Sequence, residues 1–320
     1  MITVSDILHL PYTPSLTEGG IAYALHSLPY LYNKGSSYDS LRRVVAGAAV
    51  QLAFRRYLSE QNIPFEVKSA VPFTEHDRYD VSLGGRRCDI QSYLISRRDQ
   101  ISELQHNPQA LLKAPALVAF DQHAGEGHSP FDLYLFAFLS GEVTPSAKDL
   151  QKGIGTKKPY YLVHRMADAW NRPRKWNPLG TLALKSESDE TQTIEIGGQE
   201  VGRAVRSCIV ELPPRRRAEL QNEFFSLSYV HIQSAPHARI GIYSPVRNET
   251  YLIGPQDWGN IWINGMDVAL AGYITRDDFS RRASFIQTGS LVFQYEATHV
   301  KNLAVPVSDL KPLSELFARA

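Results

Sequence analysis

A two-residue glycine turn within residues 79–93 constrains this chain more than any other feature, because it predicts a β-hairpin. The Gly84-Gly85 pair has the composition of the tight turns that join antiparallel strands. Asp80 lies four residues before this turn and Asp89 lies four residues after it. The two carboxylates are therefore expected near each other at one end of the paired strands, and Gln91 is expected on the same face as Asp89.

Two neighbouring carboxylates repel each other unless a positive charge lies between them. A divalent cation with oxygen ligands is the usual solution in proteins. The hairpin therefore predicts a metal site at Asp80 and Asp89. The alternative is a solvent-facing hairpin on which both acids are ordinary surface residues.

Residues 38–58 predict a long helix before the hairpin. Apolar side chains recur there at roughly helical spacing, at Leu41, Val44, Val45, Ala48, Leu52 and Tyr57. Small residues in the stretch 47–58 would let this helix lie close to a sheet. Residues 65–73 predict a strand between the helix and the hairpin.

This order of a helix, a strand and a hairpin that carries Asp80, Asp89 and Gln91 resembles the PD-(D/E)xK nuclease superfamily. The resemblance covers about residues 36–165 and rests on pattern and order. It implies an α/β fold with a restriction-endonuclease-like core, in which a mixed sheet is flanked by helices. It also implies that Asp80 and Asp89 hold Mg²⁺, or Mn²⁺, as the cofactor.

Two positions depart from the superfamily pattern. Gln91 stands where the superfamily usually has Lys, and Gln51 stands where many members have Glu. A glutamine amide hydrogen-bonds water or a phosphate oxygen but brings no charge. The resemblance implies that Gln91 positions the attacking water or the phosphate. It implies that Gln51 hydrogen-bonds a metal-bound water, so both glutamines join Asp80 and Asp89 in the expected catalytic set.

The activity that the resemblance implies is metal-dependent endonucleolytic cleavage of double-stranded DNA, in restriction or antiviral defence. Cleavage of both strands would need two active sites and hence a homodimer. The two glutamines leave two other hypotheses open. One is a catalytically inactive subunit that keeps the nuclease fold and binds DNA. The other is a scaffold that binds other subunits of a defence complex.

Two apolar runs follow the hairpin, at residues 132–139 and 160–164. Continuous apolar runs of this length are typical of strands that are buried on both faces. They complete a predicted nuclease domain at residues 1–170, which includes an N-terminal extension.

The second half of the chain has a different pattern. Residues 171–178 are rich in Pro and Asn and predict a linker. Short strand signals then alternate with turn residues, so residues 171–320 predict a mostly β domain for target recognition or dimerisation. Within it, residues 275–283 predict a short helix that is capped by Thr275.

The region from Lys148 to Trp176 holds eight Lys and Arg residues against two Asp residues, although the whole chain has a net charge of only +1. Clustered cations attract phosphates, and the aromatic side chains between them can pack on sugars or bases. The alternative is a solvated connector between domains. The nucleic-acid-binding residues predicted here are Lys152, Lys157, Lys158, Arg172, Arg174 and Lys175.

Residues 121–128 form a glycine-containing loop with two histidines and two acids. A Zn²⁺ site is one interpretation of such a cluster. The favoured interpretation is a loop beside the active site, in which His123 or Glu126 contacts metal-bound water or phosphate.

Two further features of the sequence bear on the setting. The two cysteines, Cys88 and Cys208, cannot build a disulfide framework. The sequence does not begin with a charged segment followed by an apolar run, and no stretch approaches about 18 apolar residues. We therefore expect a cytoplasmic protein without a membrane partner.

Overall fold

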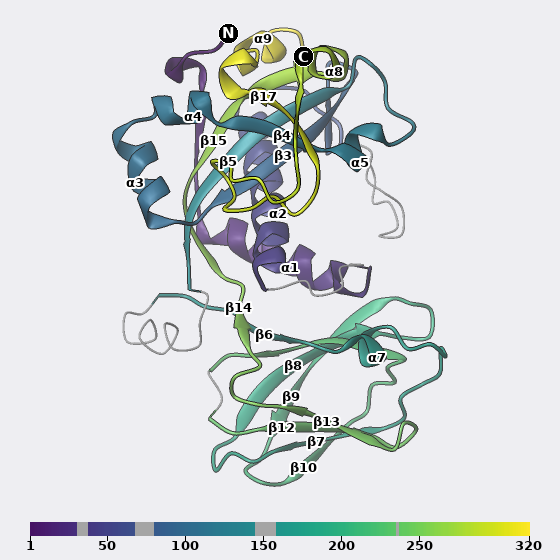
Figure 1. The fold of residues 1–320 in the computed structure, drawn as a ribbon. Helices are drawn as coiled ribbons and strands as arrows, with labels where there is room; N and C mark the ends of the chain where they lie inside the picture. The colour runs from purple at the N-terminus through teal and green to yellow at the C-terminus, as the bar shows by residue number, and fades with distance from the viewer. Residues whose placement is uncertain (31–37, 68–79, 145–157, 235–236) are drawn as a thin grey trace. The chain divides into compact units, whose positions relative to one another are not determined.

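The computed structural model describes residues 1–30, 38–67, 80–144, 158–234 and 237–320. The chain is mixed α/β and divides into two compact units (Figure 1). The α/β class predicted from the sequence is confirmed at this level. Unit 1 contains Met1–Gly20, Arg43–Glu142 and Asn264–Ala320, and unit 2 contains Ile21–Arg42 and Val143–Ile263.

Unit 1 is built on a five-stranded mixed sheet in the order β1, β15, β5, β3, β2. These strands are β1 (Leu8–Pro11), β2 (Val81–Leu83), β3 (Arg86–Ile95), β5 (Leu133–Val143) and β15 (Ile263–Thr275). β3 and β5 run parallel, whereas β1 pairs antiparallel with β15 and β2 pairs antiparallel with β3. A three-stranded sheet contains β16 (Ser284–Ile286), β17 (Asn302–Pro306) and β4 (Pro115–Ala119).

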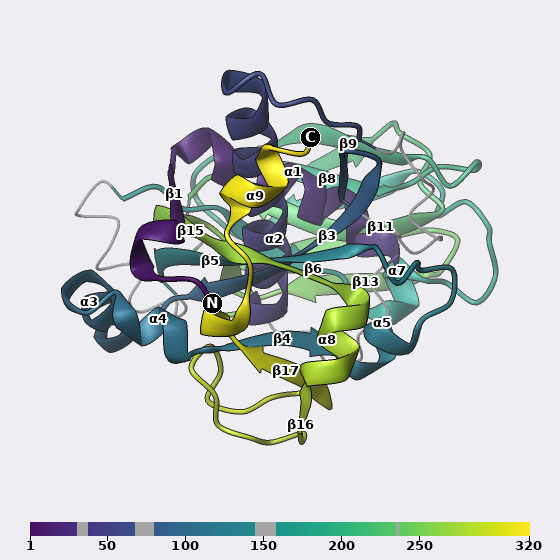
Figure 2. The same ribbon diagram turned by 90° about the horizontal axis from the view of Figure 1, so that it is seen from above.

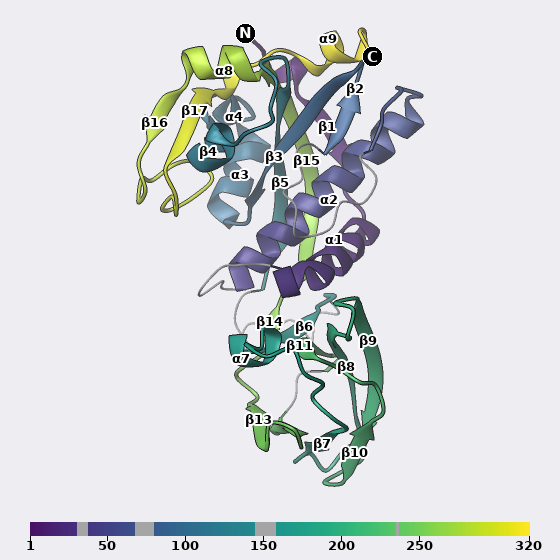
Figure 3. The same cartoon turned by 90° about the vertical axis from the view of Figure 1, so that its right-hand side faces the viewer.

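The five-stranded sheet lies between helix α2 (Tyr38–Glu60) on one face and the three-stranded sheet on the other (Figure 3). Helix α1 (Pro14–Ser27) packs beside α2. Figure 2 shows α5 and α8 side by side at one end of β4. The shorter helices of unit 1 are η1 (Val4–Asp6), α3 (Arg98–His106), α4 (Gln109–Lys113), α5 (Phe120–Ala124), α8 (Arg276–Arg282), η3 (Val307–Asp309) and α9 (Leu313–Phe317).

The burial of β5 explains its apolar sequence. Every residue from Leu133 to Leu139 is buried. Alternate side chains, those of Tyr134, Phe136 and Phe138, belong to an apolar cluster shared with β4 and β17. The remaining side chains face α2, because Ala137 is the register partner of Ser92, whose hydroxyl approaches Gly47 of that helix. The strand predicted at residues 132–139 is therefore confirmed.

The helix predicted at residues 38–58 is confirmed as α2. The strand predicted at residues 65–73 is described only in part: Glu66 forms a bridge with Ser82 of β2, and residues 68–73 lie outside the described residues.

Unit 2 contains two antiparallel sheets that share one apolar cluster. The first sheet has the order β14 (Gly259–Asn260), β6 (Leu162–Arg165), β11 (Ser226–Ile232), β8 (Gln192–Gln199), β9 (Val205–Leu212). The second has the order β10 (Arg217–Leu220), β7 (Leu182–Ser186), β12 (Ile240–Ser244), β13 (Glu249–Ile253). The short helices η2 (Leu28–Tyr30) and α7 (Asp168–Asn171) also belong to this unit.

The two units do not coincide with the domains predicted at residues 1–170 and 171–320. The strand expected to complete the first domain, β6, pairs with β11 and β14 of unit 2. β15 pairs with β1, and the chain after it builds unit 1. The physical reason is strand pairing over a long sequence separation, which local patterns do not reveal. The short helix predicted at residues 275–283 is confirmed as α8, since the Thr275 hydroxyl accepts a hydrogen bond from the Asp278 amide at 3.2 Å.

Helix α1 approaches the backbone of α2 closely at Gly20. A Cβ atom at this position would lie 2.4 Å from the carbonyl oxygen of Val45. Alanine favours a helix over glycine by about 1 kcal/mol. We nevertheless expect Gly20→Ala to lower the free energy of unfolding by about 1–3 kcal/mol, because the two backbones must move apart. Urea denaturation measures this change.

Gly19→Ala is the matched control in the same helix. A Cβ atom there would meet the Cδ1 atom of Leu52, the end of a flexible side chain that can turn away. This variant should keep the stability of the wild type or gain from the better helix former. Equal losses for the two variants would contradict the close backbone contact at Gly20.

Candidate active site

The predicted hairpin is confirmed. Gly84 and Gly85 join β2 to β3 with φ values of +55° and +72°. Positive φ at both central residues is what a type I′ hairpin turn requires, which explains the glycine pair. The strand register pairs Val81 with Cys88 and Leu83 with Arg86.

The pairing changes at Asp80. Its amide donates a hydrogen bond of 2.9 Å to the Cys88 carbonyl oxygen, although Val81 is the register partner of Cys88. Two residues of one strand therefore lie opposite one residue of the other, which is the arrangement of a β-bulge. A bulge interrupts the alternation of side chains, so the face of Asp80 does not follow from its position relative to Asp89.

The Asp80 carboxylate is held by α2 and by the neighbouring strand. One carboxylate oxygen accepts a hydrogen bond of 2.6 Å from Gln51 Nε2, and the other accepts one of 2.7 Å from the Ile90 amide. Arg55 of α2 donates to the Asp80 carbonyl oxygen at 3.1 Å. The structure thus brings together Gln51 and Asp80, two of the four predicted catalytic residues.

Asp89 faces the other side of the sheet from α2, because it is three residues from Ser92, which approaches that helix. Its carboxylate accepts a hydrogen bond of 2.8 Å from Gln122 Nε2 and is also hydrogen-bonded by Gln91. Burial raises the pKa of Asp89 to about 6, although hydrogen bonds from Gln122 and Gln91 and the charge of Arg276 act to lower it. Gln91 and Asp89 thus form the second pair of predicted residues that lie together. This pair is on the opposite side of the sheet from Gln51 and Asp80, so the two carboxylates do not meet on one face as the hairpin pattern predicted.

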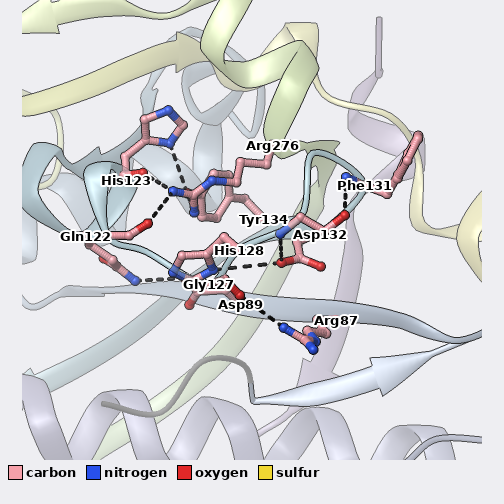
Figure 4. A network of polar contacts seen from close by, with 12 residues as sticks. Arg87, Asp89, Gln122, His123, Gly127, His128, Phe131, Asp132, Tyr134 and Arg276 are labelled. Atoms are coloured by element: carbon pink, nitrogen blue, oxygen red, sulfur yellow. Dashed lines mark hydrogen bonds and ion pairs between the residues drawn. The ribbon is translucent and has the colours of Figure 1, made fainter. Parts of the chain in front are cut away.

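A chain of hydrogen bonds centred on Tyr134 lies beside Asp89 (Figure 4). Arg276 Nη1 donates to the Tyr134 hydroxyl at 2.8 Å, and that hydroxyl lies 3.0 Å from His123 Nδ1. Burial raises the pKa of Tyr134 and lowers that of His123, so both groups are neutral. The phenol hydroxyl then donates a hydrogen bond to the imidazole. His123 Nε2 then donates to the Ser280 hydroxyl at 3.0 Å.

The loop at residues 121–128 contributes unequally to this site. His123 is part of the hydrogen-bonded chain, and Arg87 donates to the Gly127 carbonyl oxygen at 3.2 Å. Glu126 is exposed and makes no hydrogen bond or ion pair with the residues that the structure describes. Within the same described ranges, no group of three or more His, Cys, Asp or Glu side chains is placed to hold a metal ion.

Of the predicted nucleic-acid-binding residues, Lys152 and Lys157 lie outside the described residues. The other four, Lys158, Arg172, Arg174 and Lys175, belong to unit 2 rather than to the unit that carries the two aspartates.

Sequence reasoning missed three side chains that surround Asp89, namely Gln122, Tyr134 and Arg276. Tyr134 is the register partner of Asp89 in the parallel pair of strands, and Arg276 opens α8, far along the chain. Both lie near Asp89 because β3, β5 and β15 follow one another in the sheet. No local pattern in the sequence marks them.

The residues around Asp89 suit a divalent cation in donor chemistry. Its half-buried carboxylate makes no ion pair in the part of the chain that the structure describes, and a cation would offset the cost of its desolvation. Mg²⁺ takes hard oxygen ligands and is often held by only one or two carboxylates, with water and phosphate completing its shell. Asp89 would provide the carboxylate, and Gln91 and Gln122 would provide neutral oxygen donors. Both oxygens of Asp80 already accept hydrogen bonds.

Comparison with family models, with curated proteins and with solved structures gives no match to this chain. None of the helices in the described ranges is both long enough and apolar enough to span a bilayer.

The raised pKa of Asp89 predicts a pH-dependent stability. The folded state binds this proton more tightly than the unfolded state, so the wild type should lose stability relative to Asp89→Asn as the pH rises from about 4 to 6. The shift from 3.8 to about 6 sets an upper limit of about 3 kcal/mol on this loss. Urea denaturation of both proteins in EDTA across this range measures it.

Asp278→Asn provides a control of opposite sign. Hydrogen bonds from Arg281 and Lys311 lower the pKa of Asp278 to about 2. The wild type should therefore gain stability relative to this variant as the pH rises from about 2 to 4. A constant difference between the wild type and Asp89→Asn over the whole range would contradict the raised pKa of Asp89.

Proposed function

We propose that unit 1 is a metal-dependent DNA endonuclease of the PD-(D/E)xK type, with a restriction-endonuclease-like core and a role in restriction or antiviral defence. The hydrogen bond of 2.6 Å between Gln51 and Asp80 is the observation that carries this proposal. The resemblance pairs one polar residue of the core helix with the first acid of the hairpin. These two side chains are in contact although 29 positions separate them.

The site also contains a positive charge. Gln91 stands where the superfamily has Lys, so it brings no cation to the hairpin. Arg276 acts on Asp89 electrostatically and is oriented by its hydrogen bond to Tyr134. A cation held in place near the reacting phosphate stabilises the charge that develops during hydrolysis.

In the proposed reaction, a water oxygen bonds to phosphorus and the bond to the 3′ oxygen breaks, which leaves a 5′-phosphate and a 3′-hydroxyl. Bound Mg²⁺ would supply a water of lowered pKa and would stabilise charge on the phosphate. Asp89 would hold the cation, and Asp80 would fix the hairpin on the α2 side through its hydrogen bonds with Gln51 and the Ile90 amide. Gln91 would hydrogen-bond the attacking water or a phosphate oxygen, and Arg276 would balance negative charge.

A second candidate is a DNA-binding subunit that does not cleave. Two observations favour it: both Asp80 carboxylate oxygens are occupied at 2.6 and 2.7 Å, and the described residues lack a group of three metal-ligating acids, histidines or cysteines. This candidate predicts DNA binding that is the same in EDTA and in Mg²⁺.

Cleavage of supercoiled plasmid in Mg²⁺ or Mn²⁺ tests the proposal. We expect nicked or linear product that depends on the metal and falls at least about 100-fold in Asp89→Asn, because this variant loses the charge that holds the cation. Asp99→Asn, a change at an exposed acid of α3, should cleave as the wild type does.

Thermal unfolding gives a second readout that does not depend on activity. A ligand that binds only the folded state stabilises it by about 2.7 kcal/mol at 100 times its dissociation constant. Millimolar Mg²⁺ should therefore raise the Tm of the wild type and leave that of Asp89→Asn unchanged. DNA binding without cleavage and without a Mg²⁺-dependent Tm would replace the proposal with the second candidate.

A further inference from the structure

Unit 2 contains a cavity of about 650 Å³ between the segment that follows α7 and the turn that follows β12. Pockets that bind small ligands have volumes of about 300–1,000 Å³, so one nucleotide would fit. The Ser244 hydroxyl joins the two walls, because it donates to the Leu179 carbonyl oxygen at 2.6 Å and accepts from the Arg247 amide at 3.2 Å. The cavity is therefore preformed by the fold of unit 2.

Four cationic side chains line this cavity, those of Arg172, Arg174, Lys175 and Arg247, against the single carboxylate of Asp168. Arg247 is fixed by a hydrogen bond of 2.8 Å to the Ala169 carbonyl oxygen and by an ion pair with Glu249.

Arg174 and Lys175 differ from the other two cations. Both are exposed, and neither side chain makes a hydrogen bond or an ion pair with any residue that the structure describes. Their charge is available to a ligand without the loss of an existing contact. A ligand that binds here is therefore expected to be an anion.

Apart from Asn177, the rest of the lining is apolar. Pro173, Pro178, Leu179 and Val246 contribute to the walls, and Val246 is 58% exposed. A bare inorganic anion would make no use of these walls. A nucleotide would use both parts, because it carries a phosphate at one end and a flat, largely apolar base at the other.

We propose that this cavity binds one nucleotide unit of a DNA strand. Arg174 and Lys175 contact the phosphate, and the base or sugar packs against Pro173, Pro178 and Val246. The inference rests on the proposed function in one respect, since DNA is the ligand in both. It adds a binding site in unit 2, at residues distinct from the two aspartates of unit 1.

Fluorescence anisotropy of the full chain in EDTA tests this site, with a labelled 20-base-pair duplex and one of its single strands as probes. Arg174→Gln/Lys175→Gln should weaken binding at least about 10-fold and reduce the slope of log K against log[salt] by about 2, because two phosphate contacts are lost. Val246→Trp fills the cavity and keeps its charges, so it should weaken binding without a change in slope.

Arg206→Gln/Arg215→Gln is the matched control, since it removes two exposed cations from the same unit. It should bind both probes as the wild type does. All three variants should keep the Tm of the wild type, because none of the changed side chains is buried.

Four results would overturn the proposal. They are a wild type that binds neither probe, an Arg174/Lys175 variant that binds normally, equal losses in that variant and in the control, and a Val246→Trp protein with unchanged affinity. Displacement of the strand by micromolar dAMP would also overturn it and would indicate a free nucleotide as the ligand. The cleavage assay and the Mg²⁺-dependent Tm report separately on Asp89. If the nucleotide site proposed here is overturned, these two measurements still test the proposed function.

Discussion

The parallel pairing of β3 with β5 determines where the polar side chains of unit 1 lie. Its register places Asp89 beside Tyr134 and Gln91 beside Phe136. Both faces of this strand pair are covered, so a shift of one residue would turn every side chain to the wrong face. The positions of Asp89 and Gln91 are consequently fixed by the packing of the apolar core. A site that is built on core strands in this way is held more precisely than one built on loops.

Asp89 is the residue of this arrangement whose negative charge is costly to remove from water. Burial of a carboxylate is costly unless an opposite charge or several hydrogen bonds compensate for it. Gln91, Gln122 and Arg276 provide part of that compensation, and the pKa of about 6 shows that burial still outweighs it. Strongly perturbed carboxylates of this kind are concentrated at functional sites, because a protein gains no stability from keeping them. The same reasoning separates Asp89 from Asp278, whose pKa is lowered by two cationic neighbours at the surface.

Features set by short-range physics could be predicted from the sequence. The Gly84-Gly85 turn, helix α2, the buried strand β5 and the Thr275 cap each depend on a few neighbouring residues. The resemblance placed Gln51 near the acids of the hairpin through a metal-bound water, whereas the structure shows a direct hydrogen bond to Asp80. The bulge at Asp80 could not be predicted, because it depends on which carbonyl of the opposite strand its amide meets. Arg276 and the assignment of β6 to unit 2 were missed for a related reason, since strand order brings together segments that are distant in the sequence.

The interleaved order of the two units affects how the chain can fold as it leaves the ribosome. β5 and β15 are neighbours in one sheet, yet almost the whole of unit 2 is translated between them. At about 5–20 residues per second, this interval lasts on the order of ten seconds. During that time β1 lacks its partner strand and β5 has an open edge, the kind of edge that invites pairing with another chain. The edge of β5 therefore stays open to pairing with another chain until β15 emerges.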